Sequence, residues 1–457
     1  MENNSIETDI CIIGGGVTGA SIAASLGNTG KRITIIERNW EETDRIVGEL
    51  LQPAGVHMLD KLGLSQALDN IDAQVVTGYS VYNQNKAIHI DYPLTKEMKP
   101  GLGFRNGKFV QNLRACLKAY PNIQCIEGNV TALHYSSANR IDGAVFLNSN
   151  GISVQVHAPL TIVCDGIFSK LRSELTTIPH KVTGFFAGLI LDNCRLPHPD
   201  HGHVFITDTS PFVVYPVASG KLRMLIDMPG EVPPKMQDGL IEILKQRVWP
   251  FLPDSMKQSF DSALQNEKIK MMPNHKLHPA PAKIGGVVII GDAFNMRHPL
   301  TGGGMTVAFT DVYRLSQYIK KHLLEGRLLS EEKYINDFYS DKSDETGVIN
   351  ILADALYNVL RQPVLSHACF SYLQQGGDCA TGPISLLSGI ERNKGVLMKH
   401  FSAVAKHACT KHNQTMNRTD IVKEAVRIIR PLYLHENPVW HHKLLLQLSL
   451  PFISQHK

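Results

Sequence analysis

The chain has 457 residues, of which 43% are hydrophobic and 19% charged, with a formal net charge of +4. These values exclude a disordered or fibrous chain, and the length predicts two or three domains whose core needs no disulfides. The eight cysteines include no CxxC pair and no Cys/His cluster with zinc spacing, so we expect reduced thiols and no metal site.

Residues 8–37 read as a strand, a glycine turn, a helix and a second strand, which is the pattern of a βαβ unit. Gly14 permits the tight turn, Gly16 leaves room for a pyrophosphate, and Gly19 lets the helix pack closely on the strand. Glu37 ends the second strand, where a carboxylate can accept hydrogen bonds from ribose hydroxyls and would repel a 2′-phosphate. The unit predicts an NAD or FAD site and disfavours NADP; a glycine turn without a ligand is the alternative.

The middle of the chain alternates between helical and strand-like segments. Residues 39–70 are polar and then helical, residues 104–120 predict a basic helix, and short strands follow up to residue 166. Residues 180–280 contain strands of alternating apolar and polar residues punctuated by prolines, which predict a separate antiparallel-sheet domain. Beyond Gly302 the chain is mostly helical.

The C-terminal segment is basic. Residues 391–457 hold 11 Lys or Arg and four Asp or Glu, a net charge of +7, which leaves −3 for the rest. Residues 421–430 predict an amphipathic helix with a basic face, and residues 441–452 are apolar but too short to span a membrane. Such a segment favours an anionic partner: a membrane surface, a nucleic acid or an acidic protein. We predict no signal peptide, because no basic segment precedes an apolar segment at the N-terminus, and no spanning helix, because no run reaches about 18 apolar residues.

Two further motifs follow apolar strands. The first is Asp165-Gly166 followed by Ser169 and Arg172, and the second is Gly291-Asp292 followed by Pro299 and three glycines. With the first glycine turn, they resemble, in order, the motifs of the class A flavoprotein monooxygenases. The resemblance implies FAD as the cofactor, with Asp165 and Asp292 near it.

The second motif suits a flavin on physical grounds. Asp292 can accept hydrogen bonds from a ribityl chain, and Gly303 and Gly304 would begin a helix whose N–H groups face the flavin N1–C2=O edge. His298 precedes this turn, and we favour a structural role for it over the alternative of a catalytic base.

Several blocks narrow the resemblance to the squalene monooxygenase (squalene epoxidase) family, over nearly the whole chain. These blocks are DRIVGELLQP (44–53), IDAQVVTGY (71–79), NMRHPLTGGGMTVAF (295–309) and GGDCATGPISLLSG (376–389). The family's GEFLQP reads GELLQP here, with Leu50 in place of phenylalanine. Carried over residue by residue, the resemblance implies that FAD contacts fall on Val17, Thr18, Glu37, Arg38, Arg45, Leu50, Arg114, Val130, Asp292 and Met305. The family's functional tyrosine falls on Tyr79, which we expect in a catalytic role.

The resemblance implies epoxidation of squalene to (S)-2,3-oxidosqualene with O₂ in sterol biosynthesis, through a flavin C4a-hydroperoxide. The resemblance also implies that the electrons come from NADPH–cytochrome P-450 reductase as a partner, and no second dinucleotide motif occurs in the sequence. The expected location is the cytosolic face of the endoplasmic reticulum membrane, or lipid droplets, with monotopic attachment through the C-terminal region and no nucleic acid partner.

The expected fold class is α/β, with three parts. Residues 1–175 and 283–345 form a Rossmann-like FAD-binding domain, and residues 176–282, with parts of 75–105, form an antiparallel-sheet substrate domain. Residues 346–457 form a helical, membrane-associated region, with a helical cap packed on the body of the protein as the alternative. The substrate pocket should be apolar, with residues 184–190, 210–217 and 352–357 as candidate walls or as ordinary core.

Three other functions remain as alternatives. An aromatic-ring hydroxylase of the same flavin class would bind NAD(P)H directly. A prenyl-binding escort such as a GDP-dissociation inhibitor would share the Rossmann core without the second and third motifs. A prenyl-chain reductase would incorporate no oxygen.

Overall fold

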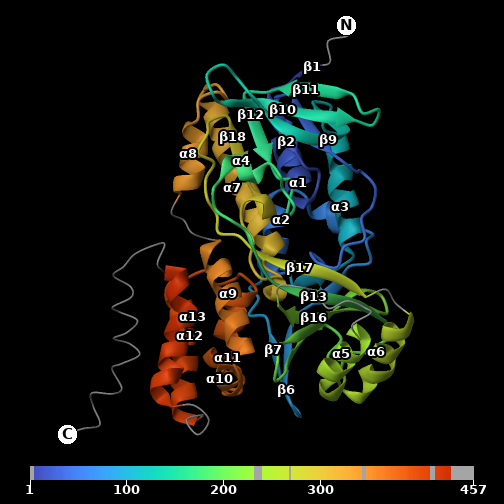
Figure 1. Ribbon diagram of the computed structural model, residues 1–457, viewed down its shortest axis with the longest axis vertical. Coiled ribbons are helices and arrows are strands. Elements are labelled where there is room, and N and C mark those ends of the chain that lie inside the picture. The colour runs from blue at the N-terminus through green and yellow to red at the C-terminus, as the bar shows by residue number, and fades with distance from the viewer. Residues whose placement is uncertain (1–4, 231–238, 267–268, 342–345, 412–416, 434–457) are drawn as a thin grey trace, which may run out of the picture.

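The computed structural model describes residues 5–230, 239–266, 269–341, 346–411 and 417–433. Figure 1 shows one sheet above a second sheet, with a group of C-terminal helices beside the lower one. Within the described residues, no helix combines the length and the apolar character needed to cross a membrane.

The upper sheet has eight strands in the order β1-β11-β10-β9-β3-β2-β12-β18. Its parallel part consists of β2 (Ile10–Ile13), β3 (Ile33–Glu37), β12 (Leu160–Val163) and β18 (Val287–Ile289), whose side chains are almost all buried. Strands covered on both faces become apolar throughout, as seen here. Since these strands are parallel, their C-terminal ends meet at one edge, and all three sequence motifs follow such an end.

The rest of this sheet is an antiparallel meander beside the parallel strands. It consists of β9 (Ile123–Tyr135), β10 (Ile141–Asn148) and β11 (Ser153–His157), and β1 (Ser5–Glu7) extends it. β9 also pairs with β3 in parallel, so it joins the two parts into one sheet.

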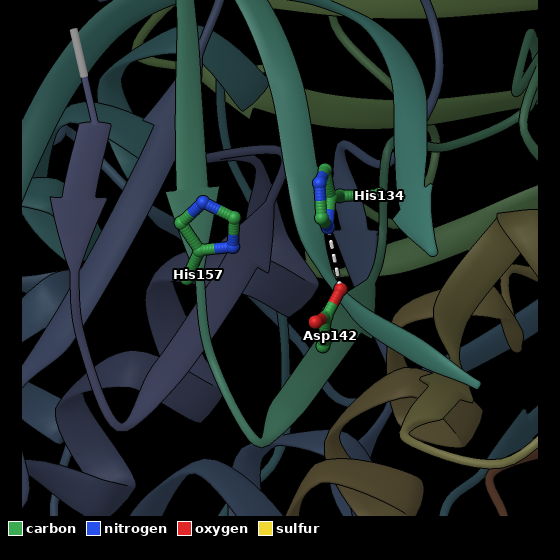
Figure 2. Close-up of side chains that lie close together, drawn as sticks. All are labelled: His134, Asp142 and His157. Carbon is green, nitrogen blue, oxygen red and sulfur yellow. Dashed lines mark hydrogen bonds and ion pairs between the residues drawn. The ribbon is translucent and has the colours of Figure 1, made fainter. Parts of the chain in front are cut away.

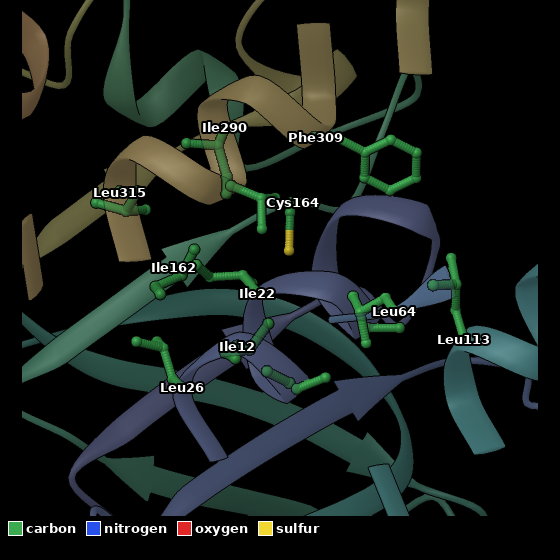
Figure 3. Close-up of a cluster of buried hydrophobic side chains, with 14 of the residues drawn as sticks. Ile12, Ile22, Leu26, Leu64, Leu113, Ile162, Cys164, Ile290, Phe309 and Leu315 are labelled. Carbon is green, nitrogen blue, oxygen red and sulfur yellow. The ribbon is translucent and has the colours of Figure 1, made fainter. Parts of the chain in front are cut away.

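Helices pack on one face of the parallel strands. They are α1 (Val17–Leu26), α2 (Pro53–Lys61), α3 (Asn106–Ala115) and α7 (Gly304–Leu324), with α8 (Lys333–Ser340) against α7. The core between them holds Ile12 and Ile162 from strands, Ile22 and Phe309 from helices, and Leu113 from α3 (Figure 3). The predicted basic helix over 104–120 is shorter than expected and continues as a 3₁₀ turn at Cys116–Ala119.

The lower sheet has seven strands in the order β17-β13-β16-β15-β14-β6-β7. They are β6 (Gly78–Asn83), β7 (Lys86–Asp91), β13 (Lys181–Asp192), β14 (His201–Ile206), β15 (Phe212–Ala218), β16 (Lys221–Pro229) and β17 (Lys270–Lys276). All neighbours are antiparallel except β6 and β14, which pair in parallel. The expected antiparallel sheet is present, and its parallel pair arises because the early β6–β7 hairpin joins the edge of the later strands.

Smaller elements complete the fold. α5 (Leu240–Val248) and α6 (Asp254–Asn266) share a core with the lower sheet. Short strands β4 (Leu50–Leu51), β5 (Gln74–Val76) and β8 (Gly101–Gly103) form a third sheet, and α4 (Arg172–Leu175) follows the second motif.

The C-terminal helices are α9 (Gly347–Arg361), α10 (Pro363–Leu373), α11 (Asp378–Leu387), α12 (Lys394–Lys411) and α13 (Arg418–Tyr433). Figure 1 shows them grouped beside the lower sheet. α9 contacts the turn at Pro299–Thr301, so this helical region reaches the third motif.

Candidate functional site

A cavity of about 510 Å³ lies at the C-terminal edge of the parallel strands and extends to the lower sheet. Clefts at this edge of a parallel α/β sheet are where such folds bind ligands. Fourteen of the residues predicted from the sequence line it. They are Gly14, Gly16, Val17, Thr18, Glu37, Arg38, Arg45, Leu50, Tyr79, Val130, Asp165, Asp292, Gly304 and Met305.

Three predicted residues do not line the cavity, and each has another contact. A Cβ at Gly19 would lie 1.7 Å from the Gly14 carbonyl oxygen, so this glycine allows the helix to touch the preceding turn. Arg114 donates from Nε to the Gly15 carbonyl oxygen at 2.8 Å and thus supports the turn from behind. A Cβ at Gly303 would lie 2.6 Å from a methyl carbon of Ile349 on α9, so Gly303 marks a close helix contact.

The first glycine turn is held by the end of β3. The Gly15 N–H donates to Oε2 of Glu37 at 2.7 Å, and Asn39 N–H donates to Oε1 at 3.1 Å. Arg114 lies with its guanidinium 4.0 Å from Glu37 and stacks over Trp40 at 4.9 Å. The carboxylate therefore has a fixed position at the cavity wall, beside the N-terminus of α1.

The second and third motifs place two carboxyl groups in the cavity wall, with Asp165 half-buried and Asp292 open to the cavity. Burial raises the pKa of Asp165 and of Asp292, while the cations around each oppose the shift. Oδ1 of Asp165 has no hydrogen-bond partner among the described residues. Arg172 lies between the motifs and donates to the Asp292 and Ala293 carbonyl oxygens at 3.4 and 3.5 Å. Both carboxyl groups could therefore accept hydrogen bonds from the hydroxyl groups of a bound ligand.

The polar groups of the cavity wall and the free space beside the N-terminus of α1 together fit a dinucleotide. Gly16 lines the cavity, yet a Cβ there would meet nothing within 4 Å, so the space beside the α1 N-terminus is free for a phosphate. Glu37 and Asp165 line the same cavity, and Oδ1 of Asp165 has no hydrogen-bond partner among the described residues. The residues present therefore fit FAD, whose flavin end would lie towards Asp292 and α7.

The glycine-rich turn before α7 is built on His298. Its Nδ1 accepts the Leu300 N–H at 3.3 Å and caps the turn at Pro299–Thr301. Its ring stacks on Tyr357 at 3.6 Å, and Nε2 lies 3.2 Å from Nδ2 of Asn274. Gly302 has φ of 63°, which only glycine adopts readily. These contacts of His298 support the turn, and His298 is absent from the cavity wall; its structural role stays a prediction.

Tyr79 is linked to this turn through Gln52. Gln52 Nε2 donates to the Tyr79 hydroxyl oxygen at 2.6 Å and to the Thr301 carbonyl oxygen at 2.8 Å, and Tyr92 donates to Gln52 Oε1 at 2.9 Å. Burial raises the pKa of Tyr79, so its phenol stays protonated. Gln52 and Tyr92 were missed by our sequence reasoning, although Gln52 stands inside the GELLQP block.

The lower sheet supplies an apolar end of the cavity. Val213, Val214 and Tyr215 of β15 line it, with Leu225 of the neighbouring β16 and Met272 of β17. Residues 210–217 thus contribute as expected. Residues 184–190 and 352–357 were wrong as wall candidates, because their side chains pack in the core or under the His298 turn.

The ionisable groups next to this apolar end are either paired with an opposite charge or uncharged. Arg223 donates to Glu49 from two nitrogens at 2.6 and 3.2 Å, and both residues are buried. Burial opposes charge on Arg223, but the bonds to Glu49 outweigh it, and the net shift of the Arg223 pKa is upward. Burial lowers the pKa of His203 to about 3, so this imidazole is neutral near pH 7.

The amphipathic helix of the tail is present, but its apolar face is covered. Ile421, Ala425 and Ile428 of α13 are buried against neighbouring C-terminal helices. Lys423 and Arg427 are exposed, and they pair with Asp420 and Glu424 on the same helix. The apolar face that we expected to meet a membrane instead packs inside the protein, and the predicted apolar stretch at 441–452 lies outside the described residues.

Comparisons with known proteins agree with this geometry. Residues 157–429 match the sequence profile of a family described as squalene epoxidase. Squalene epoxidase 3 of Arabidopsis thaliana is 42% identical, over 87% of this chain and 78% of its own length. Squalene epoxidase erg1 of Schizosaccharomyces pombe is 38% identical, over 87% and 89%. The solved structure of the flavin-dependent brominase Bmp2 shares the fold, with a TM-score of 0.68 and 16% identity over 90% of this chain and 100% of its own.

Proposed function

The chain belongs to the squalene epoxidase family, and we propose that it is an FAD-dependent monooxygenase that epoxidises squalene with O₂ to (S)-2,3-oxidosqualene in sterol biosynthesis. The observation that carries this proposal is that one cavity joins two kinds of surface. At one edge it gathers the ends of the strands that carry the three flavin motifs, and at the other an apolar wall suited to a hydrocarbon.

The chain's own residues would bind FAD along the strand edge. The α1 N-terminus beside Gly16 would hold the pyrophosphate, Glu37 the adenosine ribose, and Asp165 and Asp292 the polar chain towards the flavin. Reduced FAD supplies the activation of O₂ that the protein side chains cannot perform. The N–H groups at the start of α7, near Gly304, would stabilise negative charge at the flavin ring.

The lower sheet would orient squalene and exclude water. Val213, Val214, Leu225 and Met272 offer only apolar surface, and the neutral His203 adds no charge to the wall. A water-poor site protects an oxygen-transfer reaction from loss of the oxidant to solvent. We assign Tyr79 a positioning role at the junction, because it holds Gln52, which in turn holds the carbonyl of Thr301.

The electrons would come from NADPH–cytochrome P-450 reductase. The family to which the chain belongs supports this proposal, and no second dinucleotide motif occurs in the sequence. The test is anaerobic reduction of the purified flavoprotein by NADPH, with and without the reductase, followed by squalene and air. We expect flavin bleaching and oxidosqualene only when the reductase is present. Fast bleaching by NADPH alone would instead support the aromatic-ring hydroxylase, and a colourless protein would support the prenyl-binding escort.

Attachment to the cytosolic face of the endoplasmic reticulum membrane or of lipid droplets is part of the proposal. Squalene dissolves in the bilayer, and the tail carries a net charge of +7 over residues 391–457. Because the apolar face of α13 is covered, we assign lipid contact to residues 434–457, whose sequence contains HHKLLLQLSLPF.

A truncation after Tyr433 tests this assignment without removing the packed helices. We expect flotation with anionic liposomes to fall while FAD content is retained. A Lys423→Glu/Arg427→Glu variant of the full chain is the matched control for simple charge loss on α13. Unchanged flotation of the truncated protein would refute the role of residues 434–457.

A further inference from the structure

Three side chains of the antiparallel meander converge outside the flavin cavity. They are His134 on β9, Asp142 on β10 and His157 at the end of β11 (Figure 2). One ligand atom from each lies within 4.8 Å of the other two, and all three residues are half-buried. His134 Nδ1 and Asp142 Oδ1 are 2.6 Å apart, and the two imidazole rings stand edge to face at 4.6 Å.

The register of the three strands and a β-bulge bring these groups together. His134, Gly143 and His157 lie on one rung across the three strands, and the register shifts between Ile141 and Gly143. Asp142 is therefore the extra residue of a β-bulge, an irregularity that commonly redirects a side chain. Gly143 has φ of 145°, and a Cβ there would lie 1.7 Å from the Val156 carbonyl oxygen, so glycine is required between the two histidines on this rung.

The charges around this group leave a place for a cation. Among the described residues, Asp142 has no ion pair with Lys or Arg, and its only ion-pair contact is His134. Neither ring nitrogen of His157 makes a hydrogen bond with a described residue, although the ring faces the other two groups (Figure 2). A carboxylate and two imidazoles with so few protein partners are typical ligands of a transition metal ion.

We propose that His134, Asp142 and His157 form a binding site for one divalent transition ion of borderline softness, with Zn²⁺ as its best occupant. Two nitrogens and one carboxylate oxygen disfavour Mg²⁺ and Ca²⁺, which prefer oxygen ligands. The ion would take the place of the hydrogen bond between His134 and Asp142, with ligand distances of about 2.0–2.2 Å reached by small side-chain movements. Water would complete the coordination on the open side.

The ion would fasten the three strands of the meander to one another. Asp142 already ties them through its carbonyl oxygen, which accepts the Ala158 N–H at 2.8 Å. None of the three ligands lines the flavin cavity. The site is therefore independent of the proposed epoxidation, and its loss should leave FAD content and oxidosqualene formation unchanged.

The test uses the untagged, flavin-loaded full chain after treatment with a chelator. Isothermal titration with Zn²⁺ should show one saturable site, and Asp142→Asn and His157→Phe should each weaken it by at least about tenfold. His198→Phe is the matched control, because His198 belongs to a separate histidine group with His89 and His201. Its Zn²⁺ binding should equal that of the wild type.

A second readout covers the case of a poorly folded variant. Amide hydrogen exchange over residues 134–157 should slow on adding Zn²⁺ to the wild type and to His198→Phe, but not to His157→Phe. The proposal is overturned if the wild type binds no Zn²⁺, if both ligand variants bind it as tightly as the wild type, or if the control loses it equally.

Discussion

Substitutions of two glycines in the first turn should have separate effects, one on the affinity for FAD and the other on the stability of the fold. Gly16 has φ of −80° and ψ of −160°, which alanine adopts freely, and a Cβ there would meet nothing within 4 Å. A Cβ at Gly19 would lie 1.7 Å from the Gly14 carbonyl oxygen and 3.0 Å from Cys164 Sγ. The backbone oxygen cannot rotate away. The Gly19→Ala clash must move the helix and should cost at least about 3 kcal/mol, the upper end for overpacking.

The Gly16→Ala variant should behave in the opposite way. Its new methyl group enters the cavity where the pyrophosphate would lie, so FAD affinity should fall at least about tenfold, or ~1.4 kcal/mol. The unfolding free energy of its flavin-free form should stay within about 0.5 kcal/mol of the wild type.

Denaturant unfolding of the flavin-free proteins and fluorescence titration with FAD measure the two effects separately. Gly19→Ala should lose stability, and Gly16→Ala should lose affinity alone. Wild-type FAD affinity in Gly16→Ala would refute the location of the pyrophosphate. A stability loss in Gly16→Ala equal to that in Gly19→Ala would refute the assignment of Gly16 to cofactor binding and of Gly19 to the contact between the helix and the turn.

Three further outcomes are expected. Tyr79→Phe removes the hydroxyl that accepts the Gln52 hydrogen bond, so kcat should fall about tenfold at unchanged FAD content; an unaltered kcat would argue against positioning. Glu49→Gln leaves the Arg223 guanidinium buried without its anionic partner and should cost about 3–5 kcal/mol in denaturant unfolding, which Glu49→Leu/Arg223→Met should largely recover. Burial raises the pKa of Asp311 from 3.8 to about 6. The folded protein keeps this proton where the unfolded chain has lost it, so the contribution of Asp311 to stability falls as pH rises from about 4 to about 6. Between pH 4 and 7, unfolding free energies should shift by about 2–3 kcal/mol in favour of Asp311→Asn; a pH-independent difference would contradict this.

The strand-end motifs could be predicted because their information is local. Gly14, Glu37, Asp165 and Asp292 each follow an apolar run that predicts a buried strand, and parallel strands bring such ends to one edge. The sequence therefore indicates a common cavity before any tertiary contact is known. The same reasoning does not distinguish a glycine that lines the cavity from one that allows close packing, as Gly303 against Ile349 shows.

Contacts between distant segments could not be predicted in this way. Glu49 and Arg223 are separated by 174 residues, and Gln52 reaches Thr301 across 249. Each of these residues is an ordinary polar side chain in its local sequence. The same limit explains why a search for metal-ligand spacing gave nothing, since His134, Asp142 and His157 meet only through strand register and a bulge.

The tail shows how an amphipathic pattern can have two explanations. Ile421, Ala425 and Ile428 fall on one helical face, and periodicity alone fits both a membrane surface and a packed bundle. The structure uses that face to cover neighbouring helices. Periodicity reports that a face is apolar, whereas the identity of what covers it depends on the rest of the chain.

The most direct measurement of the central claim is isotope incorporation. The flavin-loaded protein is incubated with squalene, the reductase, NADPH and ¹⁸O₂ in unlabelled water, and the product is examined by mass spectrometry. The account predicts 2,3-oxidosqualene that carries a single ¹⁸O atom, and no label when ¹⁸O is supplied only as water. Consumption of NADPH and O₂ without labelled oxidosqualene would contradict the account.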